Sequence, residues 1–421
     1  MAPMTEAKMS EHSRVMITRL KALNFRSLAD VTVELGPLVI FVGPNASGKS
    51  NILDALRFIR DAVTTRLQQA VDRRGGMSAI RRWSPKGRPY DVTLEVRLQR
   101  PDWQASYTFT LGSERKGEFR VKRERCEVVD HQHTLAYEIR DGQWEQYPEP
   151  HPGMMELAKE IQGEAVEIFR QTLREVPTNE LFLPKAALLL GIPSFTEVWD
   201  ALRSMGFYNL YPNAFREPAK PTNPYPLDDE GGNLTSTLRA LRREHKESYQ
   251  RIAKFLGVAV PGVEEISVKQ VGSYLVAQIH HQTSTSGEQR GKPRRAAFDL
   301  AQESDGTLRL LALFTALFQQ PPRTLIGIEE PELNIHPGAL AALRDAMQLA
   351  SRDSQILVTT HSPELLSEFP PEVFRIVEMV NGVTKVGIMA EHQREAIRER
   401  LFTPAELLVM EGLQREEGEH A

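Results

Sequence analysis

The amino-acid sequence predicts an α/β protein in which a mixed or parallel core sheet carries a phosphate-binding loop, beside an antiparallel β lobe and a helical insertion. An apolar strand-like run at 38–42 leads into a glycine-rich loop and then a helical pattern. Apolar and polar residues alternate between 91 and 144, whereas 154–256 is mostly of helical character. The 421 residues exceed what one core usually organises, so we expect more than one lobe.

The elements are expected to follow one another in five segments. These are a disordered lead at 1–15, the N-terminal half of the head with the antiparallel lobe at 16–150, a mainly helical insertion at 151–258, the C-terminal half of the head at 259–390, and a charged helix and tail at 391–421. The first two strands are expected to meet at a turn over 27–30. Prolines and the lack of a long heptad run argue against a coiled coil in the insertion.

The loop GPNASGKSN at 43–51 matches the phosphate-loop pattern G-x-x-x-x-G-K-[ST] in full, between a strand and a helix. Backbone N–H groups from Asn45 through Lys49 are expected to hold nucleotide phosphates together with the helix N-terminus. Lys49 would reach the outer phosphates, and the Ser50 hydroxyl would bind Mg²⁺. The predicted nucleotide contacts are Gly43, Asn45, Ala46, Ser47, Gly48, Lys49, Ser50 and Asn51. The plainer alternative is a glycine turn that opens an ordinary helix.

Two acids follow a later apolar strand. The run 325–328 ends in Glu329 and Glu330. In phosphate-loop chemistry the first acid at such a strand end can hold Mg²⁺, and a second can polarise the attacking water. Taken alone, the two acids favour a solvated turn before Pro331. Because the chain also has a phosphate loop, we favour the catalytic interpretation.

Two further segments suit phosphate chemistry. The strand at 355–360 ends in His361, which we expect to contact a γ-phosphate because ligands collect at such strand ends; a purely structural histidine is the alternative. Ser304 and Gly306 begin a strongly apolar helix, where a hydroxyl and free N–H groups can bind an anion. A plain N-cap would explain Ser304 equally simply. Because the chain already has a phosphate loop, a second cradle makes sense if it serves a neighbouring subunit.

The ordered set NFRSL, GPNASGKSN, ESDGTLR, IEEPELNIHP and VTTHSPE resembles the RecF/SMC-like branch of ABC-type ATPases, in particular stand-alone bacterial AAA-family ATPases related to the OLD family. The resemblance covers about 16–150 and 260–389. It implies an ABC-type ATPase head, and two such heads would close face to face over two ATP molecules. A homodimer or higher oligomer with composite ATP sites is therefore expected.

The resemblance also implies a role for each matching residue. These roles are phosphate and Mg²⁺ contacts for Lys49 and Ser50, a metal-binding acid at Glu329, a general base at Glu330, a switch histidine at His361, contacts in trans from Ser304 and Gly306, and a nucleotide contact from Arg26. The sequence departs from the family pattern at Asp305, where the first signature glycine is usual, and at Glu329, where many relatives have Asp. No glutamine is assigned to the Q-loop.

The function implied by the resemblance is an ATP-hydrolysing dimeric switch that uses ATP and Mg²⁺. It would act in DNA repair or phage defence, on double-stranded DNA or with a partner effector such as a nuclease or toxin. Sixty residues follow His361, fewer than a nuclease domain of ordinary size needs, so cleavage would fall to a partner. Alternatives are an ATP-binding subunit of a membrane transporter, which the long insertions disfavour, and an ATP-dependent scaffold with little turnover.

The composition limits which kinds of partner the chain can bind. With 52 Lys and Arg against 56 Asp and Glu, the net charge is −4, so any nucleic-acid contact must come from a local basic surface. The candidates are 73–88 and 292–295, with a solvated basic loop as the equal alternative. His131 and His133 lack further ligands for a metal. The single cysteine and the lack of an apolar run of about 20 residues predict a cytoplasmic protein without membrane contact.

Overall fold

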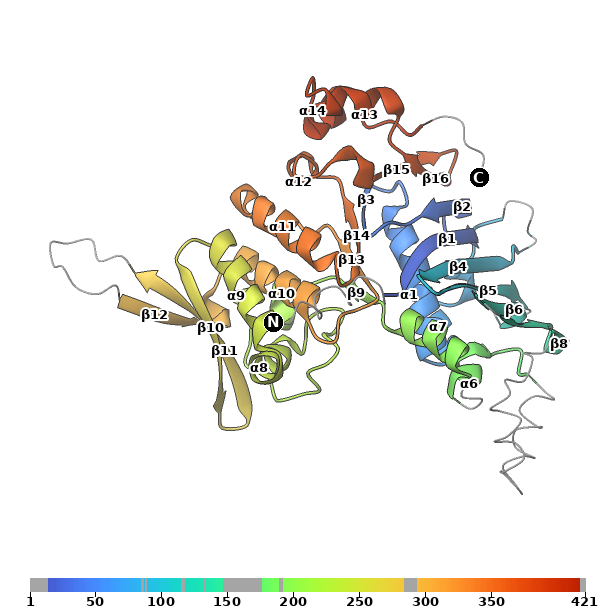
Figure 1. The fold of residues 1–421 in the computed structure, drawn as a ribbon, viewed down its shortest axis with the longest axis horizontal. Helices are drawn as coiled ribbons and strands as arrows, with labels where there is room; N and C mark the ends of the chain where they lie inside the picture. Colours follow the sequence, from blue (N-terminus) through green and yellow to red (C-terminus); the bar gives the residue numbers. More distant parts are fainter. Residues whose placement is uncertain are drawn as a thin grey trace, which may run out of the picture.

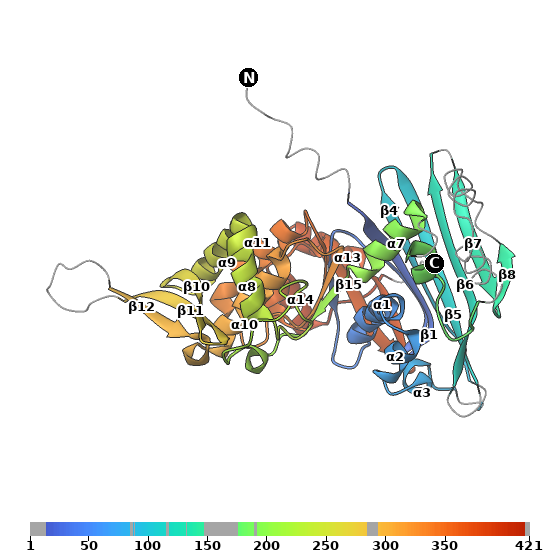
Figure 2. The ribbon, with the colours of Figure 1, turned by 90° about the horizontal axis from the view of Figure 1, so that it is seen from below.

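The computed structural model describes residues 14–84, 87, 89–114, 118–131, 133–146, 176–188, 192–283 and 294–416. Nearly all of the expected disordered lead, the first part of the helical insertion and parts of both basic stretches lie outside the described residues. Within them, helices pack on three sheets (Figure 1). A six-stranded sheet lies at the centre, a seven-stranded sheet at one end and a three-stranded sheet at the other, as Figure 2 shows.

The central sheet is parallel except at one edge. In spatial order it comprises β16 (Val383–Ile388), β15 (Phe374–Val380), β3 (Leu38–Val42), β14 (Gln355–Thr360), β13 (Leu325–Glu329) and β9 (Gly206–Tyr208). Only the β15–β16 pair is antiparallel. Val39 and Phe41 of β3 enter one hydrophobic core, while Ile40 and Val42 enter the other. This burial on both faces explains why these strands are continuous apolar runs.

The antiparallel lobe is a seven-stranded sheet. Its strands, in spatial order, are β2 (Leu28–Glu34), β1 (Met16–Phe25), β4 (Val92–Arg100), β5 (Trp103–Ser113), β6 (Phe119–Asp130), β7 (Thr134–Arg140) and β8 (Gln143–Gln146). The predicted turn at 27–30 is wrong, because Phe25 pairs with Leu28 and Asp30 remains within β2. The turn is made by Arg26 and Ser27, with Arg26 at φ 49°.

Helices cover both faces of the central sheet. On the side of the antiparallel lobe lie α1 (Lys49–Thr64), α2 (Leu67–Asp72), α3 (Met77–Ile80), α6 (Leu183–Leu188) and α7 (Pro193–Arg203). On the other side lie α8 (Leu234–Glu244), α9 (Lys246–Ala259), α10 (Asp305–Phe318) and α11 (Leu340–Ala350). The segment expected to be a helical insertion also contains β9, which pairs in parallel with β13 and so belongs to the core sheet.

The remaining elements complete the two ends of the molecule. The third sheet consists of β10 (Val263–Val271), β11 (Tyr274–Thr283) and β12 (Arg294–Asp299). The C-terminal part holds α12 (Pro363–Leu366), followed by α13 (Glu391–Arg398) and α14 (Pro404–Met410). The last two helices lie in the segment 391–421, where a single charged helix had been expected. No helix in the described part of the chain is long and apolar enough to cross a bilayer.

A charge cluster on the antiparallel lobe gives a pH-dependent contribution to stability. Glu138 on β7 accepts hydrogen bonds from Arg123, Arg125 and Arg140 at 2.8–2.9 Å. Burial opposes ionisation of Glu138, but these three arginines outweigh it and lower the pKa of Glu138 to about 2. The folded pKa lies below the ordinary value of 4.5, so the stabilisation is present above that value and is lost as pH falls through it towards about 2.

We expect Glu138→Gln to lower the free energy of unfolding by about 1–2 kcal/mol near neutral pH, an amount discounted for the exposed arginines. Urea denaturation across acidic pH should show the gap between wild type and variant closing as pH falls. Glu145→Gln is the control, because Glu145 is exposed and lies 3.9 Å from Arg140. A gap that stays constant with pH would contradict this account.

Candidate nucleotide site

The phosphate loop joins the end of β3 to the start of α1, as predicted. Gly48 adopts φ 104°, a conformation that side chains rarely take, and a Cβ there would lie 2.0 Å from Thr384 Oγ1. A Cβ on Gly43 would lie 2.0 Å from the Val377 carbonyl oxygen. The pattern therefore needs glycine at both positions because the β15–β16 hairpin presses against the loop.

A short chain of hydroxyl and amide groups holds the loop in place. Thr384 Oγ1 donates to the Ser47 carbonyl at 2.9 Å and lies 2.7 Å from Ser27 Oγ. Asn51 Nδ2 donates to the same Ser27 hydroxyl at 2.7 Å. Arg26 Nη1 lies 3.5 Å from Asn51 Oδ1, so the turn between β1 and β2 meets the start of α1. Ser27 adjoins a predicted residue, but Thr384 carries no motif that the sequence could reveal.

The loop supplies donors for an anion. Within the described residues, the backbone N–H groups of Asn45, Ala46, Gly48 and Lys49 donate to no acceptor. The Ser47 N–H differs from expectation, because it donates to the Pro44 carbonyl at 3.2 Å. Asn45, Ala46 and Ser50 are exposed, whereas Ser47 is buried.

The Lys49 ammonium lies folded onto the loop. Its Nζ donates to the carbonyls of Gly43 and Pro44 at 2.7 and 2.9 Å. Burial lowers the pKa of Lys49, and the nearby Glu330 and Glu332 oppose that shift. The structure therefore brings the lysine of the loop close to the acids that follow β13.

The predicted acids and the histidine meet where β13 and β14 end. Glu330 Oε1 and His361 Nδ1 are 3.0 Å apart, and the Glu330 N–H donates to the Thr359 carbonyl at 2.9 Å. Glu330 adopts φ 44°, which is uncommon for a residue with a side chain. Glu329 lies 3.9 Å from Arg57 of α1 and is half-buried.

Glu332 is a third acid that the sequence analysis missed. Its Oε1 accepts a hydrogen bond from the Thr360 hydroxyl, and Thr360 Oγ1 in turn accepts from the Ser362 N–H at 3.0 Å. Its other oxygen is buried without a hydrogen-bond partner in the described part of the chain. Burial raises the pKa of Glu332, against the hydrogen bond from Thr360. Glu332 thus ties the loop after β13 to the loop that carries His361; its only sequence signal was a third acid in IEEPE.

Arg309 of α10 supports the segment that follows β13. This buried side chain donates to the Leu210 carbonyl at 2.6 Å and to the Glu330 carbonyl at 2.8 Å. Burial lowers the pKa of Arg309, and Glu332 and Glu330 oppose that shift. The Arg309 guanidinium therefore links α10 to Glu330.

We expect Arg309→Met to lower the free energy of unfolding by about 2–4 kcal/mol, because two buried carbonyls lose their donor. ATP turnover should fall about tenfold or more, because Glu330 loses its support. Thermal melting and steady-state turnover measure the two effects. Arg323→Met is the matched control, since Arg323 donates to the Met205 carbonyl at the far end of the sheet. Equal losses of turnover in both variants would refute the positioning role.

Ser304 and Gly306 lie at the start of α10. Ser304 Oγ accepts from the Thr307 N–H at 3.2 Å, so the plain N-cap that was the alternative interpretation is present. A Cβ on Gly306 would lie 2.5 Å from the Asn334 carbonyl oxygen, so a glycine is needed where α10 meets the loop after β13. Asp305 pairs with Arg216, so its charge is neutralised within the chain. Within the described residues, no hydrogen bond or ion pair joins Ser304 or Gly306 to the phosphate loop.

The residues present fit Mg²⁺ and a nucleoside triphosphate. Free amides, a lysine and a glycine pinned at positive φ are the groups that phosphate loops use to hold phosphates. Mg²⁺ commonly takes one or two protein oxygens together with phosphate oxygens and water. The exposed Ser50 hydroxyl and the Glu329 carboxylate are oxygen donors of that kind.

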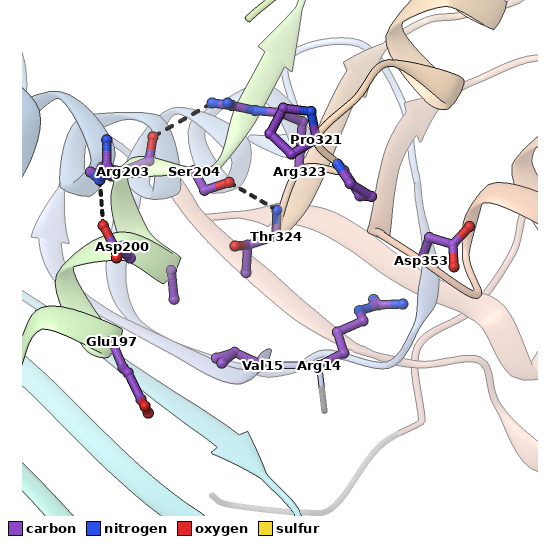
Figure 3. A pocket seen from close by; sticks show the side chains of 12 residues that line it. Arg14, Val15, Glu197, Asp200, Arg203, Ser204, Pro321, Arg323, Thr324 and Asp353 are labelled. Atoms are coloured by element: carbon purple, nitrogen blue, oxygen red, sulfur yellow. Dashed lines mark hydrogen bonds and ion pairs between the residues drawn. The ribbon is translucent and has the colours of Figure 1, made fainter. Parts of the chain in front are cut away.

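The cavity in Figure 3 is separate from this site. It has a volume of about 470 Å³ and is lined by residues such as Arg14, Arg203, Arg323, Thr324 and Asp353. Thr324 directly precedes β13, so the cavity lies at the opposite end of the parallel strands from the phosphate loop. Its arginines are matched by three acids in the lining, including Asp353.

The comparisons with known proteins agree with this geometry. The family model described as "AAA domain, putative AbiEii toxin, Type IV TA system" matches residues 159–367, and the model "AAA ATPase domain" matches 16–128. The solved structure "SmcHead bound to the C-winged helix domain of ScpA" has a TM-score of 0.52 and 14% sequence identity, covering 90% of this chain and 99% of the other. The fold and the site therefore define an ABC-type P-loop ATPase head.

Curated relatives narrow the class further. The "DNA replication and repair protein RecF" of Brucella abortus (strain 2308) is 47% identical over 47 residues, which is 11% of this chain and 12% of the relative. The "OLD nuclease" of Thermus scotoductus is 48% identical over 44 residues, 10% of this chain and 8% of the relative. The chain thus spans about an eighth or less of these relatives' length. Together with the family models and the fold, these short matches support a RecF/SMC/OLD-like ABC-type ATPase, as the sequence motifs predicted.

Proposed function

We propose that the chain binds ATP with Mg²⁺ at the loop 43–51, hydrolyses it, and acts as a dimeric switch. The observation that carries this proposal is the pair of Glu330 and His361, 3.0 Å apart at the strand ends. A carboxylate and an imidazole placed there, near Lys49, can orient an attacking water and meet a γ-phosphate. Arg26, beside the start of α1, would add a cation to the same nucleotide.

The other residues would divide the remaining tasks. Lys49 would exchange its two carbonyl partners for the outer phosphates, and Ser50 and Glu329 would hold Mg²⁺. When bound, Mg²⁺ neutralises charge on the phosphates. Glu330 would take the proton of the attacking water, and His361 would hold the γ-phosphate. In this assignment the carboxylate of Glu330 accepts the proton, and the positive charges of Lys49 and Mg²⁺ stabilise the negative charge of the phosphates.

The second half of each ATP site would come from another copy. Ser304 and Gly306 sit at the N-terminus of a fourteen-residue helix, where a hydroxyl and the positive end of the helix dipole favour an anion. They have no contact with the phosphate loop of their own chain in the described residues. Two heads that close face to face would bring these groups to the partner's γ-phosphate, and hydrolysis would reopen the dimer.

The switch would pass its state to DNA or to a partner effector, in DNA repair or phage defence. The names of the relatives support a role in DNA repair or in defence, since one relative is a replication and repair protein and one family description refers to a toxin system. A nuclease or toxin supplied by another chain would carry out any cleavage.

The test is ATP turnover per chain, measured over a range of protein concentrations with and without duplex DNA. Shared sites predict turnover that rises with concentration, because closure requires two heads. Stimulation by DNA supports a DNA-coupled switch, and indifference to DNA supports signalling to a protein partner. Turnover indistinguishable from that of a Lys49→Ala blank would refute hydrolysis at this site.

A further inference from the structure

Two consecutive helices carry a concentration of positive charge that the sequence analysis did not select. Together α8 and α9 hold six cations and two acids, a net charge of +4 in a chain whose total is −4. The cations are Arg239, Arg242, Arg243, Lys246, Arg251 and Lys254, and the acids are Glu244 and Glu247. All six cations except the half-buried Arg239 are exposed.

These cations have no ion-pair partner among the residues that the structure describes. None of the six makes an ion pair or a side-chain hydrogen bond with the described residues. By contrast, Arg74, from the candidate basic stretch at 73–88, forms ion pairs with Asp54 and Asp61. The α8–α9 face therefore keeps its charge available for an external ligand.

Some of these cations occupy positions that are electrostatically unfavourable. Arg242 and Arg243 lie in the last turn of α8, where the helix dipole favours cations. Lys246, however, lies in the first turn of α9, where the dipole disfavours a cation. Arg239 and Arg243 are also like charges four residues apart on one helix, which repel. Neutralisation by a bound polyanion would remove both penalties.

The cations border a groove of about 540 Å³ between α9 and β10. Arg242, Lys246 and Lys254 line its helical wall, and Glu264 and Glu265 line the strand wall. Glu264 is neutralised by Arg295, whose Nε lies 2.6 Å from its Oε2. The positive charge is therefore concentrated on the helical wall, and Glu265 directs an anion towards that wall.

We propose that the α8–α9 face binds the phosphate backbone of duplex DNA. Lys246 and Lys254 are eight residues apart, about 12 Å along the helix, which matches the rise of three to four base pairs. Binding of single strands relies on exposed aromatic side chains, and the aromatics of these helices are turned inward. Tyr249 is buried and donates to the Ile266 carbonyl at 2.6 Å, and the Phe255 ring lies against α10.

This surface is connected to the nucleotide site through α10. The Phe255 ring of α9 stacks on Phe318 at 5.3 Å and meets Phe314 at 5.6 Å. The helix that carries these two rings is capped at its other end by Ser304. The inference deepens the proposed function, and its coupling to ATP turnover rests on that function, whereas DNA binding itself does not.

The test is fluorescence anisotropy of a short labelled DNA duplex, titrated with the full chain at salt concentrations between about 50 and 200 mM. We expect Arg242→Ala/Lys246→Ala/Lys254→Ala to weaken binding more than tenfold and to reduce the slope of log affinity against log salt by about 2–3. The matched control is Arg66→Ala/Lys220→Ala/Arg352→Ala, which removes three exposed cations elsewhere. It should bind as the wild type does.

Several results would overturn the proposal. They are a wild type that does not bind duplex DNA, a triple variant that binds as well as the wild type, and a control that loses as much affinity. Binding to anionic phosphatidylserine vesicles without binding to DNA would replace DNA with a membrane surface. Lys49→Ala should retain DNA binding, so failure of ATP hydrolysis is distinguishable from failure of this inference. Thermal melting verifies that each variant is folded.

Discussion

Replacing Lys49 by alanine is expected to weaken ATP binding by at least about a hundredfold. In the structure the ammonium already lies in the phosphate loop, held by the Gly43 and Pro44 carbonyls. In the proposed complex it exchanges these for phosphate oxygens, and two charge-assisted hydrogen bonds contribute about 3 kcal/mol or more. A loss of that size is at least a hundredfold in affinity. Titration of a fluorescent ATP analogue measures it.

Lys385→Ala is the control for this experiment. Lys385 is an exposed cation next to Thr384, the residue that holds the loop, so the substitution removes the same charge from the same neighbourhood. We expect it to bind ATP as the wild type does. If Lys49→Ala kept wild-type affinity, the loop at 43–51 would not be the nucleotide site.

Replacing Glu330 by glutamine is expected to preserve ATP binding and to lower turnover by about 10²–10⁴, the usual contribution of a general base. Glutamine has nearly the same shape and retains an oxygen that can face His361, but it does not accept the proton of the attacking water. Because hydrolysis would reopen the dimer, the variant should accumulate as a closed dimer with ATP. Single-turnover kinetics and sizing chromatography with light scattering measure these two effects.

Glu364→Gln is the matched control for Glu330→Gln. Glu364 is an exposed acid near the same strand ends, and it accepts a hydrogen bond from the Ser362 hydroxyl at 2.8 Å. Its replacement should leave turnover within about twofold of the wild type. Wild-type turnover in Glu330→Gln would assign the general base elsewhere, and the half-buried Glu332 beside Thr360 would be the next residue to substitute.

Much of the site could be predicted because its chemistry depends on local sequence. A strand, a glycine loop and a helix are contiguous in the chain, so the fit of 43–51 required no tertiary information. The same holds for the N-cap at Ser304, which accepts a hydrogen bond from the N–H of Thr307, three residues along the chain. The neighbourhood of Glu330 and His361 followed from one rule, that parallel strands deliver their carboxyl ends to the same edge.

The misses have physical causes that are not local. Thr384 touches the loop only because the β15–β16 hairpin crosses Gly48, at a separation of more than three hundred residues. Arg309 supports Glu330 through its carbonyl, a contact between segments 21 residues apart in the chain. β9 is three residues long, too short to give a strand pattern within a helical region. The turn at Arg26 was misplaced because its residues carry no glycine or proline.

The sequence by itself determined the class of the protein, the phosphate loop, the two acids, the histidine and the caps of the helices, because each depends on spacing or order along the chain. Only the tertiary structure decided which charges are free. It paired Arg74 twice, neutralised Asp305 with Arg216, and buried Glu124 among four donors from Tyr107, Tyr137, Phe182 and Leu183. It left the cations of α8 and α9 without an ion-pair partner in the described part of the chain. The reason is that the cost or use of a charge depends on what folding brings within a few ångströms of it, which no count of residues along the chain contains.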